Sequence, residues 1–190
     1  MADQDGDVAG ATRTVVPRLS ERARRRRSVD QRLYARFPGL YRISAGAFMR
    51  LSPRSRLRRL MLGLTMSRAY AAANRRDFDL VLVAWDAESD YRPSSELMPP
   101  DMETVFHGHD GYRRLWRYWL DAFDDIRWEP EEMLDFGHRI LVTAQQQGRG
   151  SGSGVPVTQR VFQLFTMSGG LVVRQDDFLD RAQAIEAARR

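Results

Sequence analysis

Four segments in the C-terminal half, in which apolar and polar residues alternate, constrain the fold of this chain more than any other feature. They cover residues 126–134, 140–147, 155–167 and 171–178. Side chains of a strand point alternately to opposite faces of a sheet, so a period of two is typical of half-buried strands. Short stretches of turn residues join the segments. They favour successive hairpins, and the sequence therefore predicts an antiparallel meander.

Apolar residues at helical spacing precede the meander. Pro38 and Gly39 interrupt this pattern between residues 28 and 51, which favours two short helices over one. Ser52 followed by Pro53 is typical of a helix start, and the apolar positions that follow predict a helix through residue 73.

Two further helices are expected before the meander. Asp77 is a suitable N-cap for a helix whose buried face includes Trp85, and Asp110 is a suitable N-cap for the next one. That helix has the widest apolar stripe, made of Tyr112, Leu115, Trp116, Trp119, Leu120 and Phe123. Helices followed by a long meander describe an α+β domain with helices packed on one face of a curved sheet.

Composition narrows the class of protein. A chain of 190 residues with 43% hydrophobic residues can bury the core of one domain. Cysteine is absent from the sequence, which excludes disulfides, thiol nucleophiles and thiolate metal sites. The acidic N-terminus does not resemble a leader peptide, and no apolar stretch approaches the roughly 20 residues needed to cross a bilayer. A cytoplasmic protein is therefore expected.

Positive charge is concentrated at the N-terminus. Residues 1–60 hold 15 Arg and five acids, whereas residues 61–190 hold 15 Arg and 20 acids. We expect a disordered tail over residues 1–16, an Arg-rich helical extension over 17–59 and the α+β domain over 60–190. The run from Arg22 to Arg27 could contact nucleic acid or an anionic membrane. No aromatic stacking platform accompanies it, and a solvated arm is the commoner outcome for such a run. Apolar residues between Phe37 and Leu51 lie just beyond it, and they favour packing of this segment on the domain.

The last predicted strand carries two adjacent acids, Asp176 and Asp177. Only one of them can face the interior, because neighbouring side chains of a strand point to opposite faces. An inward carboxyl group among apolar neighbours is a candidate general acid or base.

Several short motifs, in this order, resemble the SnoaL-like family. They are AANRRDF at residues 72–78, GHDG at 108–111, GRGSG at 148–152, GLVVR at 170–174 and DFLD at 177–180. The resemblance covers about residues 66–188. It implies the nuclear transport factor two-like fold, a cone-shaped curved antiparallel sheet wrapped around N-terminal helices. Family members include polyketide cyclases, ketosteroid isomerases, dehydratases and epoxide hydrolases, so the fold alone selects no reaction.

The resemblance places one catalytic residue of the family on a matching residue of this chain and the others on residues of a different type. The buried acid of the epoxide-hydrolase branch falls on Asp177, which favours Asp177 over Asp176 as the inward acid. The Arg and Asp partners of that branch fall on Gln145 and Gln147. The ketosteroid-isomerase branch uses a tyrosine, a catalytic base and an acid that binds the oxyanion. Their positions fall near Ala69, Pro93 and Gln163, so this chain has a different type of residue at each of the three.

Two interpretations of Asp177 remain open from the sequence. Burial would raise its pKa and suit it to proton transfer, with Gln145, Gln147 and Gln163 donating hydrogen bonds to a substrate oxygen. Alternatively, Asp177 is a structural acid paired with one of the nearby arginines, Arg149, Arg160 or Arg174.

Two other motifs are weaker candidates. His107, His109 and Asp110 could form a metal site, but Asp110 is expected to cap a helix and the family generally works without metal, so neither a metal nor a cofactor is expected. The glycine-rich run at residues 148–154 lacks the Lys-Ser/Thr ending of a phosphate loop and reads as a hairpin.

The leading hypothesis is a SnoaL-like domain that binds a small, largely apolar molecule in the pocket of the cone beside Asp177. The expected lining residues are Tyr70, Trp85, His107, Trp116, Gln145, Gln147 and Gln163. One alternative is an enzyme of the cyclase, isomerase, dehydratase or epoxide-hydrolase type with Asp177 as acid or base. Another is an adaptor for nucleic acid or a membrane surface. Family members commonly pair through the open face of the sheet, so a homodimer is expected.

Overall fold

The sheet has seven strands in the computed structural model, which describes residue 8 and residues 10–190. They are β1 Thr12–Val15, β2 Trp85–Arg92, β3 Phe106–His107, β4 Phe123–Asp135, β5 Arg139–Gly150, β6 Pro156–Ser168 and β7 Leu171–Phe178. Their order across the sheet is β1-β4-β5-β6-β7-β2-β3. The antiparallel pairs from β4 to β7 confirm the predicted meander, whereas the parallel pairing of β2 with β7 was not predicted.

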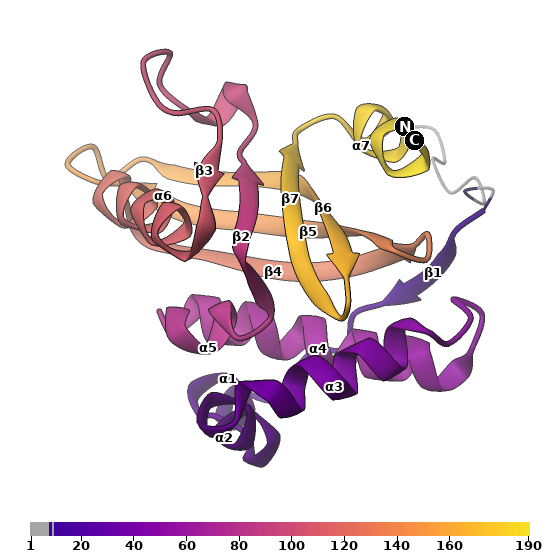
Figure 1. Ribbon diagram of the computed structural model, residues 1–190. Helices are drawn as coiled ribbons and strands as arrows, with labels where there is room; N and C mark the ends of the chain where they lie inside the picture. The colour runs from indigo at the N-terminus through magenta and orange to yellow at the C-terminus, as the bar shows by residue number, and fades with distance from the viewer. Residues whose placement is uncertain (1–7, 9) are drawn as a thin grey trace.

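Helices lie on both sides of this curved sheet (Figure 1). Five helices of the described residues form a layer on one side: α1 Glu21–Arg25, α2 Val29–Arg36, α3 Pro38–Met49, α4 Arg56–Asn74 and α5 Phe78–Leu82. A sixth helix, α6 Gly108–Ala122, packs against β2, β3 and β4. A short 3₁₀ turn spans Ser95–Leu97. α7 Arg181–Arg189 lies on the opposite side against β5 and β6. The α+β class is as predicted, but the expectation that helices pack on one face only is wrong.

α7 covers a second, smaller core. Leu134, Leu141, Phe162 and Leu164 point from the outer face of the sheet toward Ala184 of this helix. The larger core lies between the inner face and the other helices. A sheet with apolar residues on both faces needs cover on both, which explains why the C-terminal residues fold back as a helix.

α4 begins later than the sequence suggested. Its N-cap is Ser55, whose hydroxyl accepts a hydrogen bond from the backbone N–H of Arg58, and not Ser52. Ser52 instead accepts the N–H of Arg54 inside the preceding turn. The boundary expected between residues 59 and 60 therefore lies within α4.

The helix expected to include Trp85 is shorter than predicted. α5 ends at Leu82, and Trp85 is the first residue of β2. The carboxylate of Asp77 makes no capping bond in the structure; it accepts two hydrogen bonds from Arg27, at 2.7 and 2.6 Å. The apolar spacing that suggested one helix in fact continues from a helix into a strand.

α6 has the predicted apolar stripe but a different N-terminus. Its N-cap is His107. Asp110 lies in the first turn, where the positive end of the helix dipole stabilises a negatively charged side chain. The stripe is buried at Tyr112, Leu115, Trp116 and Trp119, whereas Leu120 and Phe123 are partly buried.

The N-terminal residues are more ordered than the predicted tail. β1 pairs with β4, and Val16 just beyond it is 2% exposed, so the expected disorder over residues 1–16 is wrong for residues 12–16. Residues 1–7 and 9 lie outside the described residues. Edge pairing orders β1, and a sequence pattern of only four residues could not reveal it.

The Arg-rich segment lies against the domain. Arg24 contacts Glu129 of β4 at 2.8 Å, and Arg27 contacts Asp77. Gln31 of α2 donates to the carbonyl oxygen of Arg68 in α4. Helices α1 and α2 are thereby attached to α4 and to the edge of the sheet.

Candidate functional site

A mostly apolar cavity of about 110 Å3 lies between the inner face of the sheet and the helices. All four tryptophans of the chain line it: Trp85 from β2, Trp116 and Trp119 from α6, and Trp128 from β4. The spacing of Tyr112, Leu115, Trp116 and Trp119 puts them on one face of α6. The rings of Trp116 and Trp128 lie 4.9 Å apart between centroids, so helix and sheet meet through aromatic contacts.

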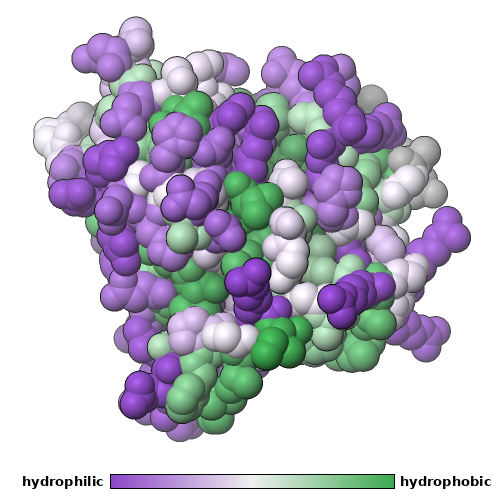
Figure 2. All heavy atoms as spheres, viewed as in Figure 1, coloured by the Kyte–Doolittle hydropathy of each residue, from purple (hydrophilic) through white to green (hydrophobic). Residues whose placement is uncertain are grey.

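α3 forms another part of the cavity wall. Tyr41, Ala45, Phe48 and Met49 line the cavity, whereas Ile43 on the opposite side of the helix is 72% exposed. Hydrophobic residues accordingly gather on the lower part of the surface in Figure 2, where α2 and α3 lie in Figure 1.

Two glycines allow α3 to approach the turn between β6 and β7. A Cβ atom on Gly170 would lie 2.3 Å from the backbone nitrogen of Gly46, and Gly170 also has φ +87. Only glycine meets both conditions at residue 170 without strain. The turn points toward α3 in Figure 1, and this contact closes the cavity on that side.

Four polar side chains form one end of the cavity wall: Tyr70 from α4, Tyr91 from β2, Gln163 from β6 and Gln175 from β7. Each is less than 8% exposed. The hydroxyl of Tyr70 donates a hydrogen bond of 2.5 Å to the Oε1 atom of Gln163. This contact connects the helix layer to the sheet.

Asp177 lies directly behind this polar end. Its Oδ1 atom accepts hydrogen bonds from the amide nitrogens of Gln163 and Gln175, at 3.2 and 2.7 Å. Its Oδ2 atom accepts one from the hydroxyl of Tyr91 at 2.8 Å. The residues lining the cavity do not include Asp177 itself. The carboxylate therefore orients the side chains that a bound molecule would contact.

Burial raises the pKa of Asp177 from 3.8 to about 6. Its three hydrogen bonds oppose this shift, because each of them stabilises the ionised carboxylate. Burial also raises the pKa of Tyr70 and Tyr91 well above 10, and the nearby charge of Asp177 adds to that effect. Both tyrosines are hydrogen-bond donors at neutral pH.

The predicted faces of the closing strand match the structure. Asp177 points inward and is 8% exposed, whereas Asp176 is held by Arg174 on the other face at 2.6 Å. The predicted alternative that Asp177 pairs with an arginine is wrong. Arg174 binds Asp176 and Arg160 binds Glu131, and the hydrogen-bond partners of Asp177 are uncharged.

The predicted lining residues divide into two groups. Tyr70, Trp85, Trp116 and Gln163 line the cavity. His107 does not: its side chain is 76% exposed and contacts Asp90 at 2.7 Å. β3 has only two residues at the rim of the sheet, and His107 points away from the core there.

Gln145 and Gln147 also lie away from the cavity. They bond to each other at 3.0 Å on the outer face of β5. The inward glutamine is Gln146, which is 2% exposed and accepts a hydrogen bond from Gln159 of β6. Neighbouring residues of a strand face opposite sides, so the two positions that the resemblance assigned point outward and the glutamine between them points inward.

Sequence analysis missed Gln175, Tyr91 and Tyr112, which all line the cavity. The signal for Gln175 was present, because residues 175 and 177 of one strand share a face. Tyr112 belongs to the predicted apolar stripe of α6, a pattern that indicates core packing and does not by itself indicate a ligand contact. The signal for Tyr91 was also present, because charged residues occupy alternate positions of β2 from Asp86 to Arg92 and Tyr91 shares the opposite face with Trp85.

The histidine motif does not assemble a metal site. His109 contacts the carbonyl oxygen of Trp85 at 3.2 Å, and Asp110 contacts Arg113 at 3.4 Å. Within residue 8 and residues 10–190, no cluster of three or more His, Asp or Glu could hold a metal ion. Every helix in that same part of the chain is too short or too polar to span a bilayer.

Comparisons with solved structures agree with this architecture. An NTF2-like protein of unknown function from Burkholderia pseudomallei has a TM-score of 0.56 and 24% identity, over 67% of this chain and 96% of that one. TerC, co-crystallised with polyporic acid, has a TM-score of 0.54 and 20% identity, over 64% and 93%. TsrD from Streptomyces laurentii has a TM-score of 0.51 and 20% identity, over 68% and 95%. At these identities the likeness shows the fold alone.

No curated protein matches the chain. A family model described as the SnoaL-like domain matches residues 66–175, from the middle of α4 to β7. That match covers more than half of the chain, and it contains the strands and most of the side chains that build the cavity. The chain belongs to the SnoaL-like domain family.

Proposed function

We propose that this SnoaL-like domain binds a small, largely apolar molecule in the cavity lined by its four tryptophans. The observation that carries the proposal is the combination of mostly apolar walls with one hydrogen-bonded polar cluster, built from Tyr70, Tyr91, Gln163 and Gln175. Binding sites for small molecules are commonly apolar pockets with a few converging polar groups that fix orientation.

The size of the cavity limits the ligand. An engineered cavity of about 150 Å3 in another protein holds benzene. The cavity of about 110 Å3 is therefore suited to one ring or a short chain, and a larger molecule requires α3 to move outward. The Tyr70 and Tyr91 hydroxyls already donate to Gln163 and Asp177, so their oxygens remain available as acceptors. A ligand with one hydroxyl group matches this arrangement. TerC was co-crystallised with polyporic acid, which supports an organic ligand.

Native mass spectrometry of the freshly purified protein tests the proposal. We expect a species heavier than the bare chain that releases a small organic molecule when the protein is denatured. A bare chain that also retains no added single-ring phenol would contradict it.

A second candidate function is proton transfer by Asp177 in a cyclisation, isomerisation, dehydration or epoxide opening. The raised pKa of about 6 favours it, because such a carboxyl exchanges protons near neutral pH. In this case Gln163 or Gln175 must turn aside to let a substrate reach the carboxyl group. Once a substrate is known, Asp177→Asn should abolish turnover while circular dichroism shows an intact fold. Unchanged turnover would exclude this mechanism.

The proposal includes a cytoplasmic location, which the absence of cysteine favours. The adaptor function has less support, because Arg24, Arg25 and Arg27 of the basic run already form ion pairs within the chain.

A further inference from the structure

A second pocket, distinct in character from the apolar cavity, lies between α1, the C-terminal end of α4 and β4. It has a volume of about 280 Å3. Its wall is rich in arginine, with Arg18, Arg24, Arg25, Arg75, Arg76 and Arg127. Tyr70 and Trp128 line both pockets, so the two share a wall.

Positive charge exceeds negative charge in this pocket. Its wall contains three acids, Glu21, Asp125 and Glu129, against the six arginines. Glu21 and Glu129 are each paired with an arginine, at 2.8 Å in both cases. Arg18, Arg76 and Arg127 form no ion pair among the described residues. The wall therefore has an excess of three positive charges.

Two guanidinium groups in the wall have unused hydrogen-bonding capacity. Arg76 donates from Nη2 to the carbonyl oxygen of Ile126 at 2.6 Å, but its buried Nη1 atom has no partner. Arg75 donates from Nη1 to the carbonyl oxygen of Arg24, and its buried Nη2 atom has only a 3.7 Å contact with Asp77. A buried donor without an acceptor is unfavourable, and an oxyanion would supply the missing acceptors.

The backbone is also unusual here. Among the described residues, the non-glycine residues with positive φ are Arg76 at 63° and Asp125 at 56°, and both line this pocket. At Arg76 the positive φ belongs to the turn that ends α4, in which the N–H groups of Arg76 and Asp77 donate to the carbonyl oxygens of Ala73 and Ala72. Burial lowers the pKa of Arg75 and Arg76, and the charges of Asp77 and Asp125 oppose this shift only in part.

We propose that this pocket binds the phosphate group of a small molecule. Guanidinium groups bind phosphate through paired N–H donors, and a doubly charged phosphate matches the excess positive charge better than a single carboxylate does. The pocket is larger than one phosphate, so it has room for a second phosphate or for the group that carries the first. The proposal does not depend on the ligand of the apolar cavity.

Isothermal titration calorimetry of the full chain tests this site, with pyrophosphate and inorganic phosphate as probes at constant ionic strength. The informative variant is Arg76→Asn, because asparagine tolerates positive φ while the guanidinium is lost. Arg18→Gln removes a second cation from an exposed position and keeps the test valid if Arg76→Asn does not fold. Arg117→Gln is the control, since Arg117 is an exposed residue of α6 outside the pocket.

We expect one pyrophosphate per chain, with affinity unchanged in Arg117→Gln and about tenfold weaker in Arg18→Gln and Arg76→Asn. Weaker binding of inorganic phosphate would indicate that more than one phosphate occupies the pocket, whereas equal binding would indicate a single phosphate subsite. The proposal is overturned if the wild-type chain binds neither probe, or if all four proteins bind with the same affinity.

Discussion

Asp177 should make the stability of this protein depend on pH. Its pKa is about 6 in the folded chain and 3.8 when unperturbed, so the folded state binds the proton more tightly than the unfolded state. The free energy of unfolding therefore falls as pH rises through this window, by on the order of 3 kcal/mol from this group. Asp177→Asn should remove that part of the pH dependence.

Urea unfolding of wild type and variants between about pH 4 and pH 7 measures this effect. Asp176→Asn is the matched control, because Asp176 is adjacent in sequence but lies on the outer face with Arg174. If wild type and Asp177→Asn show parallel pH dependence, Asp177 has an ordinary pKa and the description of the polar end is wrong.

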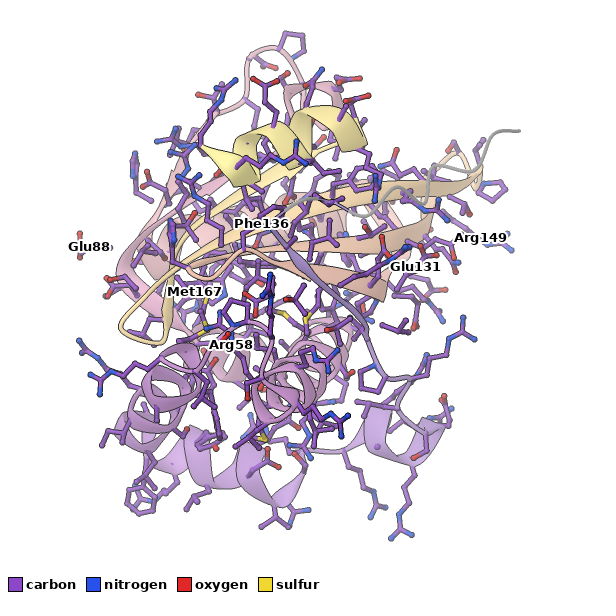
Figure 3. All side chains as sticks on the ribbon, turned by 90° about the vertical axis from the view of Figure 1, so that its right-hand side faces the viewer. Arg58, Glu88, Glu131, Phe136, Arg149 and Met167 are labelled. Atoms are coloured by element: carbon purple, nitrogen blue, oxygen red, sulfur yellow. The ribbon has the colours of Figure 1, made fainter. Side chains whose placement is uncertain are left out.

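Arg58 should be the most sensitive basic residue for stability. It is 1% exposed and donates to both carboxylate oxygens of Asp135, at 2.7 and 2.8 Å. It also donates to the carbonyl oxygens of Met49, Leu51 and Gly137. Figure 3 shows it between the helix layer and the sheet, where it connects the end of α3 to the end of β4.

Arg58→Met leaves the carboxylate of Asp135 buried without a cation, which should cost about 3–5 kcal/mol in the free energy of unfolding. Arg56→Met, two residues earlier on the exposed side of α4, should change it by less than about 0.5 kcal/mol. Chemical denaturation of both variants gives the comparison. Equal stability of the two would show that the ion pair does not hold the layers together.

At the scale of elements, two neighbouring glycines in the turn after β6 allow the contact between this turn and α3 to be tested, because both have positive φ and an added side chain would meet α3 at only one of them. Gly169 has φ +56 and open space around it, whereas a side chain on Gly170 would collide with the backbone of α3. Gly169→Ala should cost about 1–2 kcal/mol through backbone strain alone. Gly170→Ala should cost about 1–3 kcal/mol more, because α3 must shift.

Thermal unfolding measures the two losses of stability, and hydrogen exchange of α3 amides locates the disturbance. Faster exchange in α3 is expected only in Gly170→Ala. If the two variants behave alike, α3 does not rest on this turn and does not close the cavity.

The elements that sequence predicted best are those with long, regular patterns. β4 to β7 and the stripe of α6 have enough apolar positions to fix both the type of element and its face. β1 and β3 are short and are ordered by pairing with neighbouring strands, which local sequence does not encode. β2 was hidden because Trp85 continues the helical spacing of α5, although the acids after it occupy alternate positions, as in a half-buried strand.

The candidate site was predictable to a similar extent. Strand parity and the family resemblance together identified the face of Asp177. They could not show that Gln163 and Gln175 separate it from the cavity, because that depends on side-chain conformation across two strands. The position of α3 in the wall was also hidden, since its contact residues lie upstream of the matched family region.

At the scale of the whole molecule, we propose a homodimer formed through the outer face of the sheet. Near Gln145 and Gln147, this face is not covered by α7, whose core contacts lie at the other end of β5. Light scattering after size exclusion should give twice the chain mass of 21.9 kDa. Gln147→Arg should shift the protein toward monomer, because it brings like charges together at a two-fold interface. A monomeric mass at every concentration would contradict this proposal.

The central claim is that a small molecule binds in the apolar cavity, and tryptophan fluorescence tests it most directly because all four tryptophans line the wall. The probe is 4-nitrophenol, a single-ring phenol whose absorption overlaps tryptophan emission. Two variants of α3 serve as a matched pair: Ala45→Leu fills the cavity, whereas Ala47→Leu adds the same group on the exposed side.

We predict saturable quenching in wild type and Ala47→Leu, and affinity about tenfold weaker in Ala45→Leu, because the added side chain occupies the space of the ring. Equal quenching in all three proteins, or quenching that does not saturate in wild type, would contradict the claim that this cavity is a binding site.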